Sequence, residues 1–202
     1  MKTRSLLTGL VVSLVLTATA QEKKGIIAEG GSPDDRASAR VLYWDQKADG
    51  SAGWFSIDYG RPVWKKDYDD PAKFDGMTKG KVWRMGSNHW TTLDTSLPLK
   101  ISGRSVPAGS YYLGLKRSAD GGHWSLAFID PASIRKARID AFDIRKALVR
   151  FDAPMSVEKS TATADKLTIT LSYPKEDIRH VTMRLAWGNF VLTARVEVAL
   201  AE

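Results

Sequence analysis

The chain has 202 residues, a formal net charge of +7 at neutral pH and no cysteine. Without disulfides its fold must rest on a packed core, and a chain of this length is large enough to bury one. Both charge signs are spread along the chain, with no long cluster of lysine and arginine, which argues against a nucleic-acid partner.

Residues 1–20 have the layout of a secretory signal peptide. Basic residues precede an apolar run, Leu6 to Leu16, and Ala18 and Ala20 stand at the small-residue positions before a cleavage site. The apolar run is shorter than the roughly 20 residues of a membrane-spanning helix, and no later run replaces it. We therefore expect an exported protein, periplasmic or secreted after removal of the signal peptide near Ala20, with no membrane span in the mature chain.

Residues 21–40 are predicted to be a disordered, flexible leader, because they are rich in Gly, Ser, Asp and Lys and offer few large apolar groups to bury. We expect a single folded domain over residues 41–202. Alternation of apolar and polar residues predicts strands throughout this domain. The first candidates are Trp54–Tyr59, Lys81–Met85, Thr91–Thr95, Leu97–Ile101, Gly109–Arg117, His123–Phe128 and Ala147–Ala153.

Two segments between the strands differ from the short turns around them. The segment from Lys65 to Thr78 is acidic and is predicted to be a solvated loop. The segment from Asp130 to Leu148 starts with an Asp cap followed by Pro, which favours a short helix. Its basic residues from Arg135 to Lys146 fit a solvated crossover between two sheets, and they also offer a docking face.

The strongest strand signals lie at the end of the chain, in Lys166–Tyr173, His180–Trp187 and Phe190–Leu200. Only Gly188 and Asn189 separate the last two, and a two-residue loop with Gly first predicts a type II′ hairpin turn. Many short strands with turn residues between them indicate an all-β fold. We therefore predict an antiparallel β-sandwich with a short helical crossover.

Six pieces of the chain follow one another in a recognisable order and spacing. They are IDYGRP (57–62), GKVWRMGSN (80–88), TTL (91–93), ISGRSVPAGSYYL (101–113), HWSLAF (123–128) and LAWGNFVLTARV (185–196). Together they resemble the bacterial family known as domain of unknown function 2911, over the range from Trp54 to Val198. Where the family usually has Glu after an Asn, this chain has His89, and the segment that starts at Lys65 is longer and more acidic than the family's glycine-rich connector. The resemblance implies an exported, mostly β domain and implies no activity.

The stretch Lys81–Thr92 gathers unusually many large polar and aromatic side chains, and two hypotheses explain it. In the first, Arg84, Asn88, Thr91 and Thr92 only fix the turn Gly86–His89. In the second, arginine forks hold an anionic or sugar-like envelope ligand, a tryptophan stacks on it, and Asn88 and His89 orient it. The candidate ligand-binding residues are Arg61, Trp83, Arg84, Asn88, His89, Trp90 and Thr91.

Two other functions remain open. A hydrolase would use His89 as base with Ser87 and Asp58, although GSNH is not a nucleophile elbow. A docking domain would bind a protein through a sheet edge or through Arg135–Lys146. No metal site is expected, because the three histidines lack ligand spacing and the acidic segment lacks the EF-hand pattern. No cofactor is predicted, and the favoured function is non-catalytic binding or a structural role.

Overall fold

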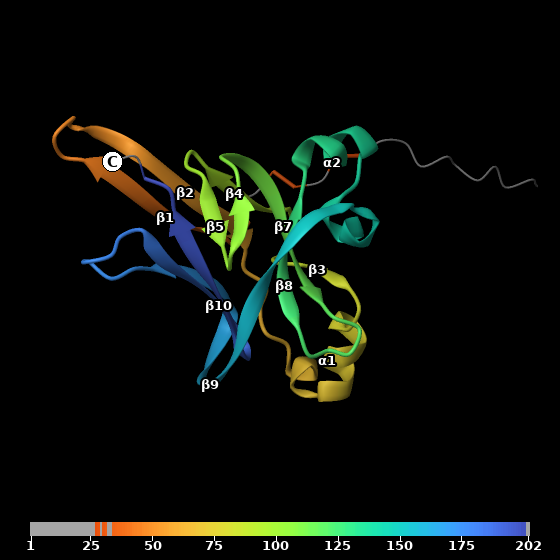
Figure 1. Cartoon of the computed structure of the whole chain (residues 1–202). Helices are drawn as coiled ribbons and strands as arrows, with labels where there is room; N and C mark the ends of the chain where they lie inside the picture. The colour runs from red at the N-terminus through yellow and green to blue at the C-terminus, as the bar shows by residue number, and fades with distance from the viewer. Residues whose placement is uncertain (1–26, 29, 32–33, 201–202) are drawn as a thin grey trace, which may run out of the picture. The chain divides into compact units, whose positions relative to one another are not determined.

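The computed structural model describes residues 27–28, 30–31 and 34–200, and from Asp34 on these belong to one unit (Figure 1). The predicted signal peptide lies outside the described residues, as does much of the predicted leader. The strands are β1 (Arg36–Asp45), β2 (Gly50–Gly60), β3 (Val82–Arg84), β4 (Thr91–Thr95), β5 (Leu99–Ile101), β6 (Arg104–Val106), β7 (Gly109–Arg117), β8 (Trp124–Ile129), β9 (Val149–Ser172) and β10 (His180–Val198). The helical elements are η1 (Lys66–Asp69), α1 (Pro71–Thr78), α2 (Pro131–Ala137) and η2 (Ala141–Lys146).

The strands pair antiparallel in the order β1-β2-β4-β7-β8-β9-β10-β5-β6, and β3 pairs with the second half of β7 beside β4. The long strand β9 pairs first with β8 and then with β10, so it carries the sheet from one layer into the other. Both layers pack on one core, which includes Phe55 and Leu113 from the first and Leu167 and Met183 from the second. The predicted all-β, antiparallel fold is confirmed.

Period-two alternation explains this core. In β2, Phe55, Ile57 and Tyr59 are buried, and the residues between them are at least partly exposed. The same alternation starts in β1 at Arg36, inside the range 21–40 that the sequence predicts as leader. The folded part of the chain therefore starts before residue 41, where the sequence predicts it to start. Ala37 and Ala39 pack against the core, but they are too small to stand out as core residues in the sequence.

The predicted helical segment after Asp130 is confirmed, but it joins β8 to β9, which pair with each other in one sheet, and does not cross between two sheets. Asp130 caps α2 by accepting hydrogen bonds from the backbone N–H groups of Ala132 and Ser133. Ile134 and Ile144 are buried in a second apolar cluster on the outer face of the sheet, while the basic side chains of the segment point to solvent. The crossover therefore covers one face of the sheet and shields Trp90.

The predicted hairpin turn at Gly188 and Asn189 is wrong. Both residues lie inside β10, which continues to pair with β9 on either side of them. Gly188 has φ of +60°, and the pairing register shifts around it, because β9 makes an irregular excursion opposite. The glycine therefore marks a bulge, which the sequence alone does not distinguish from a two-residue turn.

The excursion of β9 lets its residues pair with the chain that follows β2. The backbone N–H of Trp64 donates to Asp165 O at 2.7 Å, and that of Leu167 donates to Pro62 O at 3.0 Å. This contact links the two layers at a second point and fixes the position of Trp64.

The predicted acidic loop, which starts directly after Trp64, is wrong. The segment forms η1 and α1, with Asp70 as the cap of α1 and Pro71 in its first turn.

No helix among the described residues combines the length and apolar character needed to cross a membrane.

Candidate functional site

The stretch that the sequence singles out, Lys81–Thr92, is divided between the two faces of the sheet. Trp83 stacks on Trp187 at 4.9 Å between ring centroids and packs against the main core. Trp90 is buried on the outer face, where it stacks on Tyr112 at 4.7 Å. The two tryptophans proposed as stacking surfaces are therefore engaged by other rings of the protein and lie in different apolar clusters.

Arg84 fixes the turn that follows β3. Its Nη1 donates to Asn88 O at 3.1 Å, and the hydroxyl of buried Thr91 donates to Met85 O across the same turn. Asn88 has φ of +64°, an unusual conformation for a residue other than glycine. These contacts are the ones expected if the polar residues hold the turn in place.

The guanidinium of Arg84 also lies 4.1 Å from the centre of the Phe142 ring of η2. Burial lowers its pKa from the usual value for arginine, and the charge of Asp140 opposes this effect. Arg61 lies elsewhere, with its Nη1 at 4.0 Å from Asp35. Asn88 and His89 are exposed. The candidate residues therefore do not share one cleft among the described residues.

The residues of the hydrolase hypothesis are not linked either. The carboxylate of Asp58 accepts a hydrogen bond from Arg36 Nε at 2.9 Å, and Arg36 also donates to Trp90 O at 3.1 Å. Within the described part of the chain, no hydrogen bond connects Asp58, His89 and the Ser87 hydroxyl. The orienting contact that a triad needs is thus taken up by an arginine.

A different set of residues forms a cavity at the place where η1 and α1 meet β9 and β10. Trp64 rests on Gly188 of β10, and its Nε1 donates to Asp69 Oδ1 at 2.9 Å. Tyr68 meets the Trp64 ring edge-on at 5.4 Å and the Trp187 ring at 5.1 Å. The segment between β2 and β3 is therefore anchored on the sheet by its aromatic residues.

Phe74 of α1 continues this aromatic surface. Its ring lies 5.6 Å from that of Phe190 in β10, and Phe190 in turn lies 4.9 Å from Trp124. Trp124 and Trp187 are buried below, with 5% of each exposed. The four upper rings are half-buried, so each keeps part of its surface open. We call these four rings the aromatic surface; they are Trp64, Tyr68, Phe74 and Phe190.

The aromatic surface lines a cavity of about 420 Å³. A cavity of this size suits a small organic ligand, for which roughly 300 to 1,000 Å³ is usual. Hydrogen-bonding groups surround the rings and come from η1, α1, β7, β9 and β10. They are Asp69, Asp75, Arg117, Glu158, Ser160 and Asn189.

Arg117 holds α1 against the sheet. Its Nη1 donates to Asp75 Oδ1 at 2.7 Å and to Thr78 Oγ1 at 2.8 Å, and its Nε donates to Gly121 O at 2.9 Å. Its guanidinium also lies 5.3 Å from the Trp124 ring. Only 13% of the Arg117 side chain is exposed. One buried cation therefore ties the helix, the β7–β8 turn and the aromatic cluster together.

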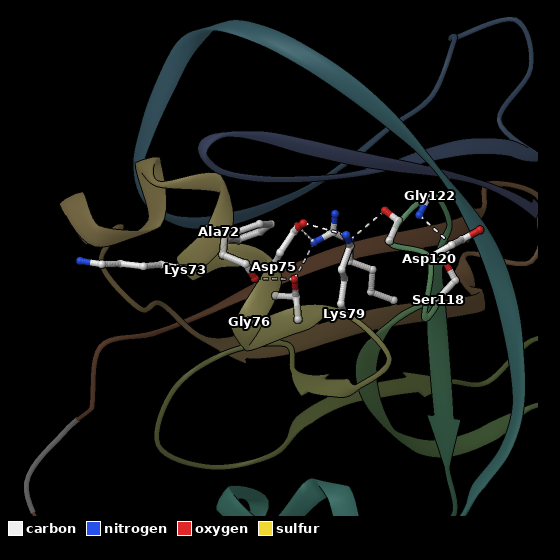
Figure 2. A network of polar contacts seen from close by, with 12 residues as sticks. Ala72, Lys73, Asp75, Gly76, Lys79, Ser118, Asp120 and Gly122 are labelled. Carbon is white, nitrogen blue, oxygen red and sulfur yellow. Dashed lines mark hydrogen bonds and ion pairs between the residues drawn. The ribbon is translucent and has the colours of Figure 1, made fainter.

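Figure 2 shows the network around this contact, with Asp75 of α1 and Lys79, just after α1, facing the turn that carries Ser118, Asp120 and Gly122. Lys79 Nζ lies 2.9 Å from Asp75 Oδ2. The hydrogen bonds from Lys79 and then Arg117 lower the pKa of Asp75 from 3.8. The network keeps Asp75 ionised, which suits a residue that holds α1 in position through its contact with Arg117.

A second hollow of about 500 Å³ lies between β5, β6 and the end of β10. Its lining is mostly aliphatic and includes Leu99, Val106 and Val198, and its charged residues Lys100 and Glu197 pair with each other at 3.5 Å. Its lining has no aromatic ring, and Ser105 is its polar side chain besides that pair. The aromatic cavity is therefore the better candidate site.

Among the residues that the structure describes, no group of three or more His, Cys, Asp or Glu side chains is placed to hold an ion.

One part of the aromatic cavity is visible in the sequence. Trp64, Tyr68 and Phe74 lie within one short segment. Their convergence on Phe190 and Gly188 depends on the tertiary fold, which local patterns do not reveal.

Comparison with known proteins places the chain in a family. No curated protein and no solved structure matches it. One family model, described as "Protein of unknown function (DUF2911)", matches residues 45–196. That range includes β2 to β9 and nearly all of β10, and so all residues of the aromatic cavity. The chain therefore belongs to the DUF2911 family.

Proposed function

We propose that the protein is a non-catalytic binding module of the cell envelope that holds a sugar-like ligand in the aromatic cavity. The observation that carries this proposal is the aromatic surface of four half-buried rings around a cavity of about 420 Å³. A sugar ring has apolar C–H faces that pack on aromatic rings and hydroxyl groups that donate to carboxylates and amides. The envelope location follows from the predicted signal peptide.

The rigidity of the site supports binding. Trp64 is held by its contact with Gly188 and its hydrogen bond to Asp69, and α1 is held by Arg117. A site that is already ordered loses little conformational entropy when a ligand binds. The rings therefore present a stable platform in the free protein.

Asp75 is not suited to act as the proton donor of a glycosidase. Hydrolysis of a glycoside needs a carboxylic acid with a raised pKa as proton donor. The pKa of Asp75 is instead lowered by Lys79 and Arg117. An anionic ligand, the other class expected from the sequence, is disfavoured here because Asp69, Asp75 and Glu158 outnumber Arg117 in the lining. Anion binding through Arg61 and Arg84 stays a prediction.

The test is titration of the purified chain with a panel of oligosaccharides, followed by tryptophan fluorescence and calorimetry. We expect at least one oligosaccharide to bind, with no release of shorter products on long incubation. Tyr68→Leu and Phe190→Leu should each weaken binding by about 2- to 10-fold, since stacking on one ring contributes about 0.5 to 1.5 kcal/mol.

Trp54→Leu is the matched control. Trp54 is also partly exposed but lies on the outer face of β2, away from the cavity. The control should bind as the wild type does. Thermal unfolding of each variant separates loss of the ligand contact from loss of the fold. Binding that survives both cavity variants in folded protein, or the absence of binding to every oligosaccharide, overturns the proposal.

A further inference from the structure

The charges around the cavity are unbalanced. Its lining holds three carboxylates, Asp69, Asp75 and Glu158, and one cation, Arg117. Arg117 pairs with Asp75 at 2.7 Å and Lys79 pairs with the same carboxylate at 2.9 Å, so neither cation is directed to the other two carboxylates. Lys73 Nζ lies 3.0 Å from Asp67, and neither residue lines the cavity. Among the side chains that the structure describes, the open part of the cavity is therefore negative.

The two remaining carboxylates keep acceptor capacity. Asp69 accepts one hydrogen bond from Trp64, and Glu158 accepts one from the Thr193 hydroxyl at 3.2 Å. A carboxylate has two oxygens and accepts about four hydrogen bonds. Both residues are exposed and flank the rings from different elements, η1 and β9.

The rings add to the same preference. The face of an aromatic ring carries negative partial charge and attracts cations, most strongly in Trp. Trp64 and Tyr68 stand edge-to-face at 81°, so their faces point in different directions around the cavity. Rings set at an angle beside carboxylates form the kind of surroundings that bind alkylammonium groups.

We infer that the ligand of the aromatic cavity is a cationic sugar, one that carries a protonated amine next to its hydroxyl groups, and that Asp69 and Glu158 select for that charge. This inference rests on the proposed function. It narrows the class of ligand, because stacking on the rings alone does not distinguish a sugar with an amine from a sugar without one.

The experiment compares three oligosaccharides of equal length: a glucosamine oligomer with free amines, its N-acetylated form and a glucose oligomer. Calorimetry is done below the pKa of the amine, at low and at high salt. We expect the free-amine form to bind at least about 10-fold more tightly than the other two, and we expect salt to reduce this preference.

Asp69→Asn and Glu158→Gln should each reduce the preference for the amine about 3- to 10-fold, because each weakens binding of the free-amine form more than binding of the N-acetylated form. Asp67→Asn is the matched control, since it removes the same charge from η1 outside the cavity lining. The control should keep the preference.

Equal binding of all three oligomers, or tighter binding of the neutral forms, overturns this inference and leaves the proposed function standing. A preference that falls equally in Asp67→Asn and in the cavity variants also overturns it, because the cause is then the overall charge. If none of the three binds and no other oligosaccharide does, the proposed function and this inference fail together.

Discussion

The indole ring of Trp64 lies directly over the α-carbon of Gly188, so a β-carbon at position 188 would overlap the ring. Gly188 also has φ of +60°, in the left-handed region. Gly188→Ala therefore adds backbone strain to a steric clash. We expect it to lower the free energy of unfolding by about 2 to 4 kcal/mol in urea denaturation.

The control for this prediction is Gly103→Ala. Gly103 has φ of +83°, but no atom lies within 4 Å of where its β-carbon would stand. It should therefore cost only the strain, about 1 kcal/mol. In the background of Trp64→Ala the cost of Gly188→Ala should fall to that same level. An unchanged cost in the double variant contradicts the assigned contact.

Arg117→Met should destabilise the protein by more than about 1 kcal/mol, because it removes the donor to the carbonyl of Gly121 and leaves Asp75 with Lys79 as its remaining cation. Lys116→Met, on the same strand, breaks an exposed ion pair with Asp152 and should cost less than about 1 kcal/mol. Denaturant unfolding of the two variants checks the difference. Similar values for both would show that Arg117 does not anchor α1.

The Asp75 network makes stability depend on acid. Because the folded-state pKa of Asp75 lies below 3.8, its carboxylate stabilises the protein above that pH, and the contribution is lost as pH falls through the folded-state pKa. Asp75→Asn should be less stable than the wild type near neutral pH. The gap should shrink as the pH falls through the folded-state pKa of Asp75, because the protonated side chain loses its attraction to Lys79 and Arg117. Unfolding curves recorded from neutral to acidic pH check this, and a constant gap contradicts it.

Arg84 is predicted to act on the turn after β3. Arg84→Met removes the hydrogen bond to Asn88 O and the contact with the Phe142 ring, and should cost about 1 to 2 kcal/mol. Phe142 is 73% exposed, so Phe142→Ala should cost less than about 1 kcal/mol. A double-mutant cycle should give a coupling of about 0.5 to 1 kcal/mol. Strict additivity would show that the ring contact contributes nothing.

Much of the fold could be predicted because the strands have one buried and one solvent-exposed face. The alternation at Phe55, Ile57 and Tyr59 and the Asp-Pro start of α2 were both sufficient, since each depends only on neighbours in sequence. The turn at Gly188 could not be predicted correctly. Its glycine is required by Trp64, a residue far away in the sequence, and no local pattern reports such a contact.

The candidate site was harder to predict for the same reason. The stretch Lys81–Thr92 stands out in the sequence because its polar and aromatic residues are adjacent, yet Trp83 and Trp90 enter different cores. The residues of the aromatic cavity come from separate elements, and only Trp64, Tyr68 and Phe74 are close in sequence. The segment that carries these three reads as a charged loop because its apolar residues are few and widely spaced.

The course of β9 also determines how the protein comes apart. This strand of 24 residues is bonded to β8 along its first part and to β10 along its second. Neither layer can unfold alone, because β9 is hydrogen-bonded to a strand of each layer. Backbone amides of β8 and β10 should therefore exchange with deuterium at a common slow rate, set by global opening rather than by separate fraying of each layer.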